Sequence, residues 1–372
     1  MPWLETSPMV QRSEFVRLAQ SKALPVAELC RRLGISRKTG YKWLKRAEDL
    51  REHSRRPLHS PQRTDADMED RVVALRQRHP AWGGRKIARR LCDLGCSGVP
   101  HPNTVTHILH RHGLIDTRRS GEGARYQRFE HDRPNALWQM DFKGDFALDH
   151  GRCYPLTVID DHARYNLVLH ACAGQNRLQV QPVLTEAFRR YGLPERINTD
   201  NGQPWGSPSA DHGLSHVSLW WIRLGIAVSF SAPAHPQTNG KDERFHRTLK
   251  AEVLTARHFR DLRHAQAAFD AWRPIYNEQR PHDALGLQVP ACRYQPSQRR
   301  FPEQLPPIEY GSSDIVAKVG WKGLVRFQGR CFKVSNALKD QPVAFRPTER
   351  DGYYELYYCH QRIMSIDLND PD

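Results

Sequence analysis

The stretch HPQTNGKDERFHRTLK, residues 235–250, combines a helical pattern with basic and acidic residues, and the interpretation of the central region starts from it. Its second half predicts a basic amphipathic helix. The basic residues on it are Lys241, Arg244, Arg247 and Lys250. Asp242 and Glu243 stand among them, on a surface that otherwise suits an anion. Glu243 fits either an i,i+4 salt bridge with Arg247 or a metal ion held between its carboxylate and a phosphate.

Two earlier acids lie where a metal site at a sheet edge needs them. ALWQMDF, residues 136–142, alternates, which predicts a strand with Trp138 and Asp141 on opposite faces. Asp200 ends the fourth predicted strand. The carboxyl ends of strands are where α/β folds bind ligands, so we expect Asp141, Asp200 and Glu243 to converge.

The region 130–290 alternates strand and helix patterns in the order β-β-β-α-β-α-β-α. Strands are predicted at 136–142, 152–160, 163–171, 195–199 and 226–230. Helices are predicted at 176–191, 215–224, 239–257 and 261–277. This order predicts a mixed sheet flanked by helices, which is an α/β domain.

Three carboxylates at one sheet edge have a clear chemical use. Mg²⁺ binds hard oxygen ligands and keeps room for water and phosphate oxygens. Two such ions about 4 Å apart activate a nucleophile and stabilise the leaving oxygen during phosphoryl transfer. Arg247 and Lys250 share the helical stripe of Glu243, so we expect both to contact the DNA backbone beside the metal.

Each acid also has an ordinary structural explanation. Asp141 taken alone fits a surface position on a strand, and Asp200 fits the first position of an Asp-Asn-Gly turn. Asp242 is an alternative third acid, although it points about 100° around the helix from Glu243. A second alternative pair, which we interpret as turn residues at a strand end, is Asp160 and Asp161.

The amino-terminal third is strongly basic, which favours nucleic acid as a partner. Residues 1–130 carry 26 Lys and Arg against 14 Asp and Glu, whereas residues 131–290 carry 18 against 17. VAELCRRLGISRKTGYKWLKR predicts a helix, a Gly-containing turn and a second helix capped by Ser36, so we expect a helix-turn-helix DNA-binding domain at residues 1–56. The residues expected to reach DNA are Arg37, Lys38, Tyr41 and Lys42.

A second helix-turn-helix-like domain is predicted at residues 66–116, with Asn103 or Thr104 capping its last helix. Arg85 and Lys86, at the start of its middle helix, are expected to contact DNA. Irregular spacing disfavours a zinc site in this domain, and apolar helix faces explain its cysteines. The residues weighed for zinc are Cys92, Cys96, His101 and His107.

Residues 308–372 follow a Pro-rich hinge and predict a small all-β, barrel-like domain. Its basic residues also favour DNA, and they are Lys318, Lys322, Arg326, Arg330 and Lys333. Over the whole chain, hydrophobic residues make up 39% and no apolar run approaches the ~18 residues of a membrane span. The first residues lack a signal-peptide pattern, and eight cysteines form no CxxC pair, so we expect a cytoplasmic protein with reduced thiols.

Four motifs are more specific together than any one of them alone. They are Trp138-Gln139-Met140-Asp141, Thr199-Asp200-Asn201-Gly202, HPQTNGKDERFHRTLK and YNEQRPHDALG at 276–286. In this combination the chain resembles bacterial insertion-sequence transposases of the retroviral-integrase superfamily, over roughly residues 11–300. The resemblance implies a ribonuclease-H-like core in which Asp141, Asp200 and Glu243 are the catalytic metal ligands. The 42 residues between Asp200 and Glu243 exceed the usual spacing, which keeps Asp242 open as a rival.

The resemblance also implies a reaction. The protein would bind the terminal inverted repeats of its mobile element, cleave the ends by Mg²⁺-dependent hydrolysis and join the 3′-hydroxyls to target DNA by transesterification, with Mn²⁺ substituting for Mg²⁺. Its expected partners are double-stranded DNA and further copies of itself in a dimer or larger synaptic complex, associated with the bacterial nucleoid. Two alternatives stay open: a DNA-binding regulator with a decayed core, and a nuclease of the same fold that cuts without joining.

Overall fold

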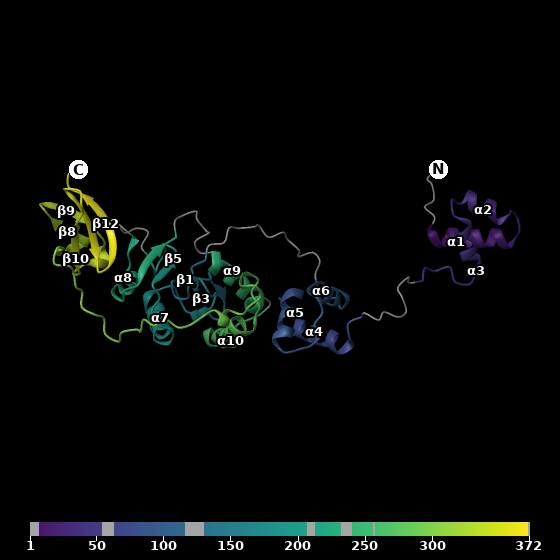
Figure 1. Cartoon of the computed structure of the whole chain (residues 1–372), viewed down its shortest axis with the longest axis horizontal. Helices are drawn as coiled ribbons and strands as arrows, with labels where there is room; N and C mark the ends of the chain where they lie inside the picture. Colours follow the sequence, from purple (N-terminus) through teal and green to yellow (C-terminus); the bar gives the residue numbers. More distant parts are fainter. Residues whose placement is uncertain are drawn as a thin grey trace. The chain divides into compact units, whose positions relative to one another are not determined.

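The computed structural model of the 372-residue chain describes residues 7–53, 63–115, 130–206, 213–231, 240–255 and 257–370 (Figure 1). The chain divides into two compact units, residues 1–63 and residues 64–372. Among the described residues, no helix has both the length and the apolar composition required to cross a membrane.

Three helices form the first unit, and the last two are the predicted helix, turn and helix. They are α1 (Pro8–Gln20), α2 (Val26–Arg32) and α3 (Arg37–Lys45). Ser36 caps α3, because its Oγ accepts a hydrogen bond of 3.1 Å from the Thr39 amide. A Cβ added at Gly40 would lie 2.5 Å from Cys30 Sγ and 2.9 Å from the Phe15 ring. Glycine at this position therefore allows α3 to pack closely on the other two helices.

Three more helices open the second unit around buried Trp82. They are α4 (Ala66–Arg78), α5 (Gly84–Asp93) and α6 (Pro102–Arg111). The predicted cap of α6 at Asn103 or Thr104 is wrong. Pro102 takes the first helical position, and the His101 ring accepts the hydrogen bond from the Asn103 amide. Proline suits that position because its fixed φ is already helical.

A mixed sheet of six strands forms the core. The strands are β1 (Leu137–Phe142), β2 (Phe146–Ala147), β3 (Arg152–Asp160), β4 (Asn166–Cys172), β5 (Arg196–Thr199) and β6 (Ala227–Phe230). Their order is β2-β3-β1-β5-β6, with β4 paired to β3. β1 is antiparallel to β3 and parallel to β5. The predicted strands are confirmed, and the short β2 is the strand that the sequence did not indicate.

Two helix pairs cover the two faces of the sheet. Trp138 and Met140 belong to the apolar cluster that includes α7 (Arg177–Tyr191) and α8 (His216–Arg223). The opposite face packs against α9 (Gly240–Leu249) and α10 (Leu262–Pro274) through a cluster that contains Ile159 and Leu169. Strand alternation therefore places Asp141 on the face covered by α9, as its pattern predicted.

The last two core helices differ from their predictions. α9 (Gly240–Leu249) and α10 (Leu262–Pro274) each continue into a π-helical turn, η4 (Lys250–Leu254) and η5 (Ile275–Gln279). The predicted single helices over 239–257 and 261–277 are wrong in this respect; Asn239 lies outside the described residues. Glu252 joins the two π turns, because it accepts hydrogen bonds from Trp272 Nε1 at 3.0 Å and from Arg280 Nε at 2.7 Å.

The carboxy-terminal region consists of antiparallel strands. They are β7 (Ile315–Lys318), β8 (Leu324–Phe327), β9 (Arg330–Lys333), β10 (Pro342–Pro347), β11 (Tyr353–Tyr358) and β12 (Gln361–Asp367). Four form a sheet in the order β12-β11-β10-β7, and β8 and β9 form a hairpin. Phe327 of the hairpin stacks on Phe345 of the sheet at 3.9 Å between ring centroids. The structure confirms that this region is built from β-strands, and it adds β7, a strand that the sequence did not indicate.

Candidate functional site

Asp141 lies near the end of β1 on the face covered by α9. Its Oδ1 accepts a hydrogen bond of 2.7 Å from the Phe142 amide. Burial raises the pKa of Asp141 to about 7, and the negative charges of Asp200 and Glu243 add to that increase. Asp200 and Glu243 thus lie close enough for their charges to act on Asp141.

Asp200 and Glu243 are exposed, one after β5 and the other on the first turns of α9. Asp200 also has the turn role that was weighed against it, since its Oδ1 accepts a hydrogen bond of 3.1 Å from the Gly202 amide. Within the part of the chain that the structure describes, Glu243 forms no ion pair, so the i,i+4 pair with Arg247, which was the alternative to a metal role, is absent.

Asp242 points the other way and is fully buried, at 0% exposure. Its two carboxyl oxygens lie 3.1 and 3.0 Å from Thr157 Oγ1, and Thr157 faces Asp141 across the β1–β3 ladder. His246, one turn further along α9, has its Nε2 2.8 Å from the same hydroxyl. Burial, followed by the charges of Asp141 and Glu243, raises the pKa of Asp242 well above its usual value.

His246 is neutral near pH 7, because burial and the positive charge of Lys143 lower its pKa to about 3. Asp141, Asp242 and His246 offer ligand atoms that all lie within 4.8 Å of one another. The sequence reasoning did not single out Thr157 or His246. The i,i+4 spacing of His246 from Asp242 was a usable signal, since those positions share one helix face.

The donor set fits a hard divalent cation. Asp141, Asp200 and Glu243 supply carboxylate oxygens, the ligand type that Mg²⁺ and Mn²⁺ prefer. Burial, with the charges of Asp200 and Glu243, raises the pKa of Asp141, and a bound cation would favour the ionised carboxylate. Asp242 and His246 are already hydrogen-bonded to Thr157, so the exposed acids are the freer ligands.

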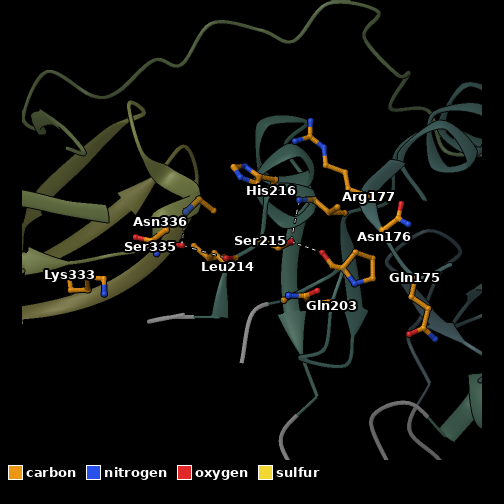
Figure 2. A pocket seen from close by; sticks show the side chains of 14 residues that line it. Gln175, Asn176, Arg177, Gln203, Leu214, Ser215, His216, Lys333, Ser335 and Asn336 are labelled. Carbon is orange, nitrogen blue, oxygen red and sulfur yellow. Dashed lines mark hydrogen bonds between the residues drawn. The ribbon is translucent and has the colours of Figure 1, made fainter. Parts of the chain in front are cut away.

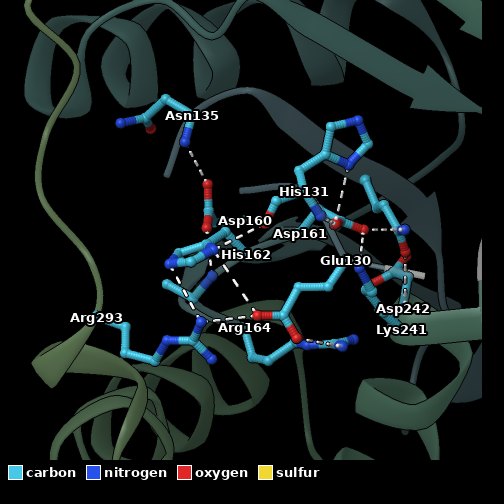
Figure 3. A network of polar contacts seen from close by, with 12 residues as sticks. Glu130, His131, Asn135, Asp160, Asp161, His162, Arg164, Lys241, Asp242 and Arg293 are labelled. Carbon is cyan, nitrogen blue, oxygen red and sulfur yellow. Dashed lines mark hydrogen bonds and ion pairs between the residues drawn. The ribbon is translucent and has the colours of Figure 1, made fainter. Parts of the chain in front are cut away.

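Asp160 and Asp161 have a different environment, shown in Figure 3. Both are buried, at 0% and 1% exposure, so interpreting them only as turn residues understates their role. Asp161 accepts hydrogen bonds from the His131 amide at 2.9 Å and from Gln139 Nε2 at 2.9 Å, and it pairs with Lys241. Burial alone would raise the pKa of Asp161, but these donors outweigh it and hold the pKa below its usual value.

Asp160 anchors the entry to the core. It accepts hydrogen bonds from the Asn135 amide at 2.7 Å and the Ala163 amide at 2.6 Å, while burial raises its pKa to about 6. Gln139 bridges this group to α9, because its Oε1 accepts a hydrogen bond from the Asp242 amide at 3.3 Å. These contacts are structural, and they bring the start of α9 to β1.

The predicted DNA-contacting residues occupy different settings. On α3 the exposed face carries four of them, and they are Arg37, Lys38, Tyr41 and Lys42. Arg247 and Lys250 are exposed on the same side as Glu243. Arg85 and Lys86 instead pair with Asp283, at 3.3 and 3.6 Å, and the Lys86 side chain is only 12% exposed. A DNA contact by Lys86 remains a prediction that would require this pair to open.

The residues weighed for zinc do not form a metal site among the described residues, where the one cluster of potential ligands is that of Asp141. Cys92 and His107 are exposed, so the apolar-face explanation fails for Cys92. Cys96 is partly buried against the cluster around Trp82.

A cavity of about 390 Å³ lies between the core and the β domain (Figure 2). Gln203, three residues after Asp200, lines it together with the starts of α7 and α8. Its basic lining residues are Arg177, His216 and Lys333. None of the lining residues is acidic, so the cavity complements a phosphate chain.

Family models match the chain along most of its length. An integrase core domain matches residues 131–236 and a second integrase core model matches residues 224–290. Homeodomain-like domains match residues 8–52 and 39–109. The carboxy-terminal domain of the IS481 family transposases matches residues 314–371.

Two curated relatives come from bacterial insertion elements. An uncharacterized 31.7 kDa protein of insertion element IS407 from Burkholderia multivorans is 31% identical over 60% of this chain and 81% of its own length. An uncharacterized 39.2 kDa protein of IS476 from Xanthomonas euvesicatoria is 27% identical over 77% of each chain. Among solved structures, the HTLV-2 integrase catalytic core domain in complex with magnesium is 15% identical, with a TM-score of 0.34, over 44% of this chain and 99% of that one.

Proposed function

Because the chain belongs to the bacterial insertion-sequence transposases of the integrase superfamily, we propose that it cuts and joins DNA at a metal centre formed by Asp141, Asp200 and Glu243. One observation carries the proposal: the first turn of α9, which includes Glu243, is held against the strand of Asp141, because Asp242 contacts Thr157, the β3 residue opposite Asp141. Burial raises the pKa of Asp141, and the charges of Asp200 and Glu243 add to that increase. Acids that repel one another in a half-buried site are typical of a divalent metal centre. We assign Glu243 as the third acid, since Asp242 is buried against Thr157.

The reaction conserves phosphodiester bonds in its second step. Water attacks the phosphorus at an element end, the P–O bond to the 3′-oxygen breaks, and a 3′-hydroxyl is released. That hydroxyl then attacks a target phosphodiester and loses its proton; a P–O bond forms to it as the P–O bond to the target's 3′-oxygen breaks, and that oxygen takes up a proton. Joining therefore needs no energy-supplying cofactor. Mg²⁺, with Mn²⁺ as substitute, would activate the attacking oxygen and offset phosphate charge when bound by the three acids.

The residues of the chain position the DNA around this centre. Arg247 and Lys250 share the exposed stripe of α9 with Glu243, which suits contacts to phosphates beside the reacting one. The cavity between the core and the β domain has room and positive charge for the neighbouring backbone, with Arg177 and Lys333 in its lining. The exposed face of α3, with Arg37 and Lys42, suits the major groove of the terminal inverted repeats.

Pairing two element ends requires more than one copy of the protein, so we propose a dimer or a larger synaptic complex on DNA. The proposal includes this assembly and places its action at the bacterial nucleoid. It also keeps the four predicted domains, at residues 1–56, 66–116, 130–290 and 308–372. The carboxy-terminal domain would add DNA contacts through its basic residues.

The test is a joining reaction with purified protein. A labelled DNA that carries the element end is incubated with a target plasmid and Mg²⁺, beside the variant Asp200→Asn. The proposal predicts joined product from the wild type and none from the variant. Cleavage without joining would identify a nuclease. Specific end binding with neither reaction, in Mg²⁺ or in Mn²⁺, would identify a regulator with a decayed core.

A further inference from the structure

The placement of Glu243 depends on the buried side of α9, because its own side chain is exposed and forms no ion pair among the described residues. That buried side includes Phe245 and Leu249, which pack in the apolar cluster of the sheet. Apolar packing is non-directional and by itself sets the position and rotation of a helix only loosely. Hydrogen bonds are directional and can set both.

One hydroxyl supplies those directional contacts. Thr157 Oγ1 lies 3.0 and 3.1 Å from the two carboxyl oxygens of Asp242 and 2.8 Å from His246 Nε2. The same oxygen lies 3.0 Å from the main-chain carbonyl oxygen of Asp141. Two successive turns of α9 are therefore tied to the strand position directly opposite Asp141. Thr157 and Asp242 are completely buried, so water does not compete for these contacts.

We propose that Thr157, Asp242 and His246 form a clasp that fixes the rotation of α9, so that Glu243 is presented to Asp141 in the geometry that binds the metal. The inference rests on the proposed function, in which Glu243 is a metal ligand. Asp242 and Glu243 are adjacent and point about 100° apart. Any rotation that releases Asp242 from Thr157 therefore also displaces Glu243 relative to Asp141. The three members of the clasp are positioning residues, not ligands.

A direct ligand role for Asp242 and His246 is the competing interpretation, since their ligand atoms and that of Asp141 lie within 4.8 Å of one another. The two interpretations differ at Thr157. A clasp needs its hydroxyl, whereas a metal bound directly by Asp242 and His246 would displace that hydroxyl and tolerate its loss. Thr157→Val, which keeps the shape and removes the hydroxyl, separates them.

The experiment uses the full chain and compares Thr157→Val with Thr248→Val and Thr157→Ser. Thr248 is the matched control, because it is a buried threonine on α9 whose hydroxyl, within the described part of the chain, bonds only to the Arg244 carbonyl of its own helix. Mn²⁺ binding to the purified protein is measured by electron paramagnetic resonance, together with thermal unfolding and the Mn²⁺ dependence of joining. Binding requires no DNA chemistry, so it reports on the clasp separately from the reaction.

The clasp predicts that Thr157→Val weakens Mn²⁺ binding about 10-fold or more, the range found when groups that orient metal ligands are removed. Thr157→Ser should recover most of the affinity, and Thr248→Val should match the wild type. Thr157→Val should also lower Tm, because Asp242 and His246 lose a buried hydrogen-bond partner, so binding is measured well below its Tm. Equal Mn²⁺ affinity in the two valine variants would overturn the clasp. So would loss of affinity in Asp242→Asn and His246→Gln but not in Thr157→Val, which would make those residues ligands.

The joining reaction tests the proposed function separately from the clasp, which Mn²⁺ binding tests. A wild type that binds Mn²⁺ through Glu243 but neither cleaves nor joins would refute the proposed function and leave the clasp to be judged on binding alone. A wild type that binds no Mn²⁺, even beside element-end DNA, would overturn both.

Discussion

The core contains two groups of acidic side chains that differ in what surrounds them. Asp161 is enclosed by donors, with the His131 amide, Gln139 and Lys241 all directed at its carboxylate. Burial raises the pKa of both carboxyls, but the donors override it at Asp161, whereas at Asp141 the charges of Asp200 and Glu243 add to it. The cost of burial is thus offset in one group and increased in the other. The hydrogen-bond donors and charges around a buried acid therefore distinguish a structural role from a metal-binding role better than its degree of burial does.

The largest expected effect follows from removing the Asp141 carboxylate. Asp141→Asn should lower joining on the order of 10³-fold, because one ligand of the reacting centre is lost. The same change should raise Tm, since a half-buried carboxylate repelled by Asp200 and Glu243 disappears. Joining assays and thermal unfolding on one preparation check both. A fall in Tm together with retained joining would reverse the comparison.

Asp161→Asn should behave in the opposite way. It leaves Lys241 buried without its counter-ion, since the two side chains are 11% and 2% exposed. Breaking a buried pair from one side costs about 3 kcal/mol or more, and urea unfolding measures it. The folded fraction should still join DNA. Asp132→Asn, at a side chain that is 79% exposed, is the control and should leave the free energy of unfolding unchanged.

The pH dependence sharpens the comparison further. Asp141 has a folded-state pKa of about 7, above its usual value, so its contribution to stability is present at acid pH and is lost as the pH rises through about 7. Metal binding needs the deprotonated acid, so Mn²⁺ affinity should weaken as the pH falls below about 7. In Asp200→Asn the midpoint for Asp141 should move down, since one repelling charge is gone. A carboxyl-carbon NMR titration detects the shift, and an unchanged midpoint would show that the two acids do not interact.

The smallest effect is expected at an exposed pair. Arg133 contacts Glu195 through two hydrogen bonds of 3.0 Å, but both side chains are at least half exposed. Solvent screens such pairs, so Arg133→Gln should leave the urea midpoint unchanged within error. A clear destabilisation would mean that ion pairing stabilises this protein irrespective of burial.

The sequence predicted what local periodicity determines. The alternation around Asp141 fixed its face of β1, and Ser36 marked the start of α3. Features set by tertiary contacts were missed. The bonding of Thr157 to Asp242 joins positions 85 residues apart, and the π turn after α9 accompanies the buried pair of Glu252 with Arg280. A pattern in a short stretch of sequence cannot include both residues of such a contact.

The most direct test of the central claim uses two neighbouring residues of α9. Glu243→Gln and Asp242→Asn are compared with the wild type for joining of a labelled element end to plasmid DNA in Mg²⁺. Both changes replace a carboxylate by an amide of equal size, one on the exposed side of the helix and one on the buried side. The account predicts no joining by Glu243→Gln and joining by Asp242→Asn within about tenfold of wild type. Joining by Glu243→Gln and none by Asp242→Asn would contradict it and make Asp242 the third acid.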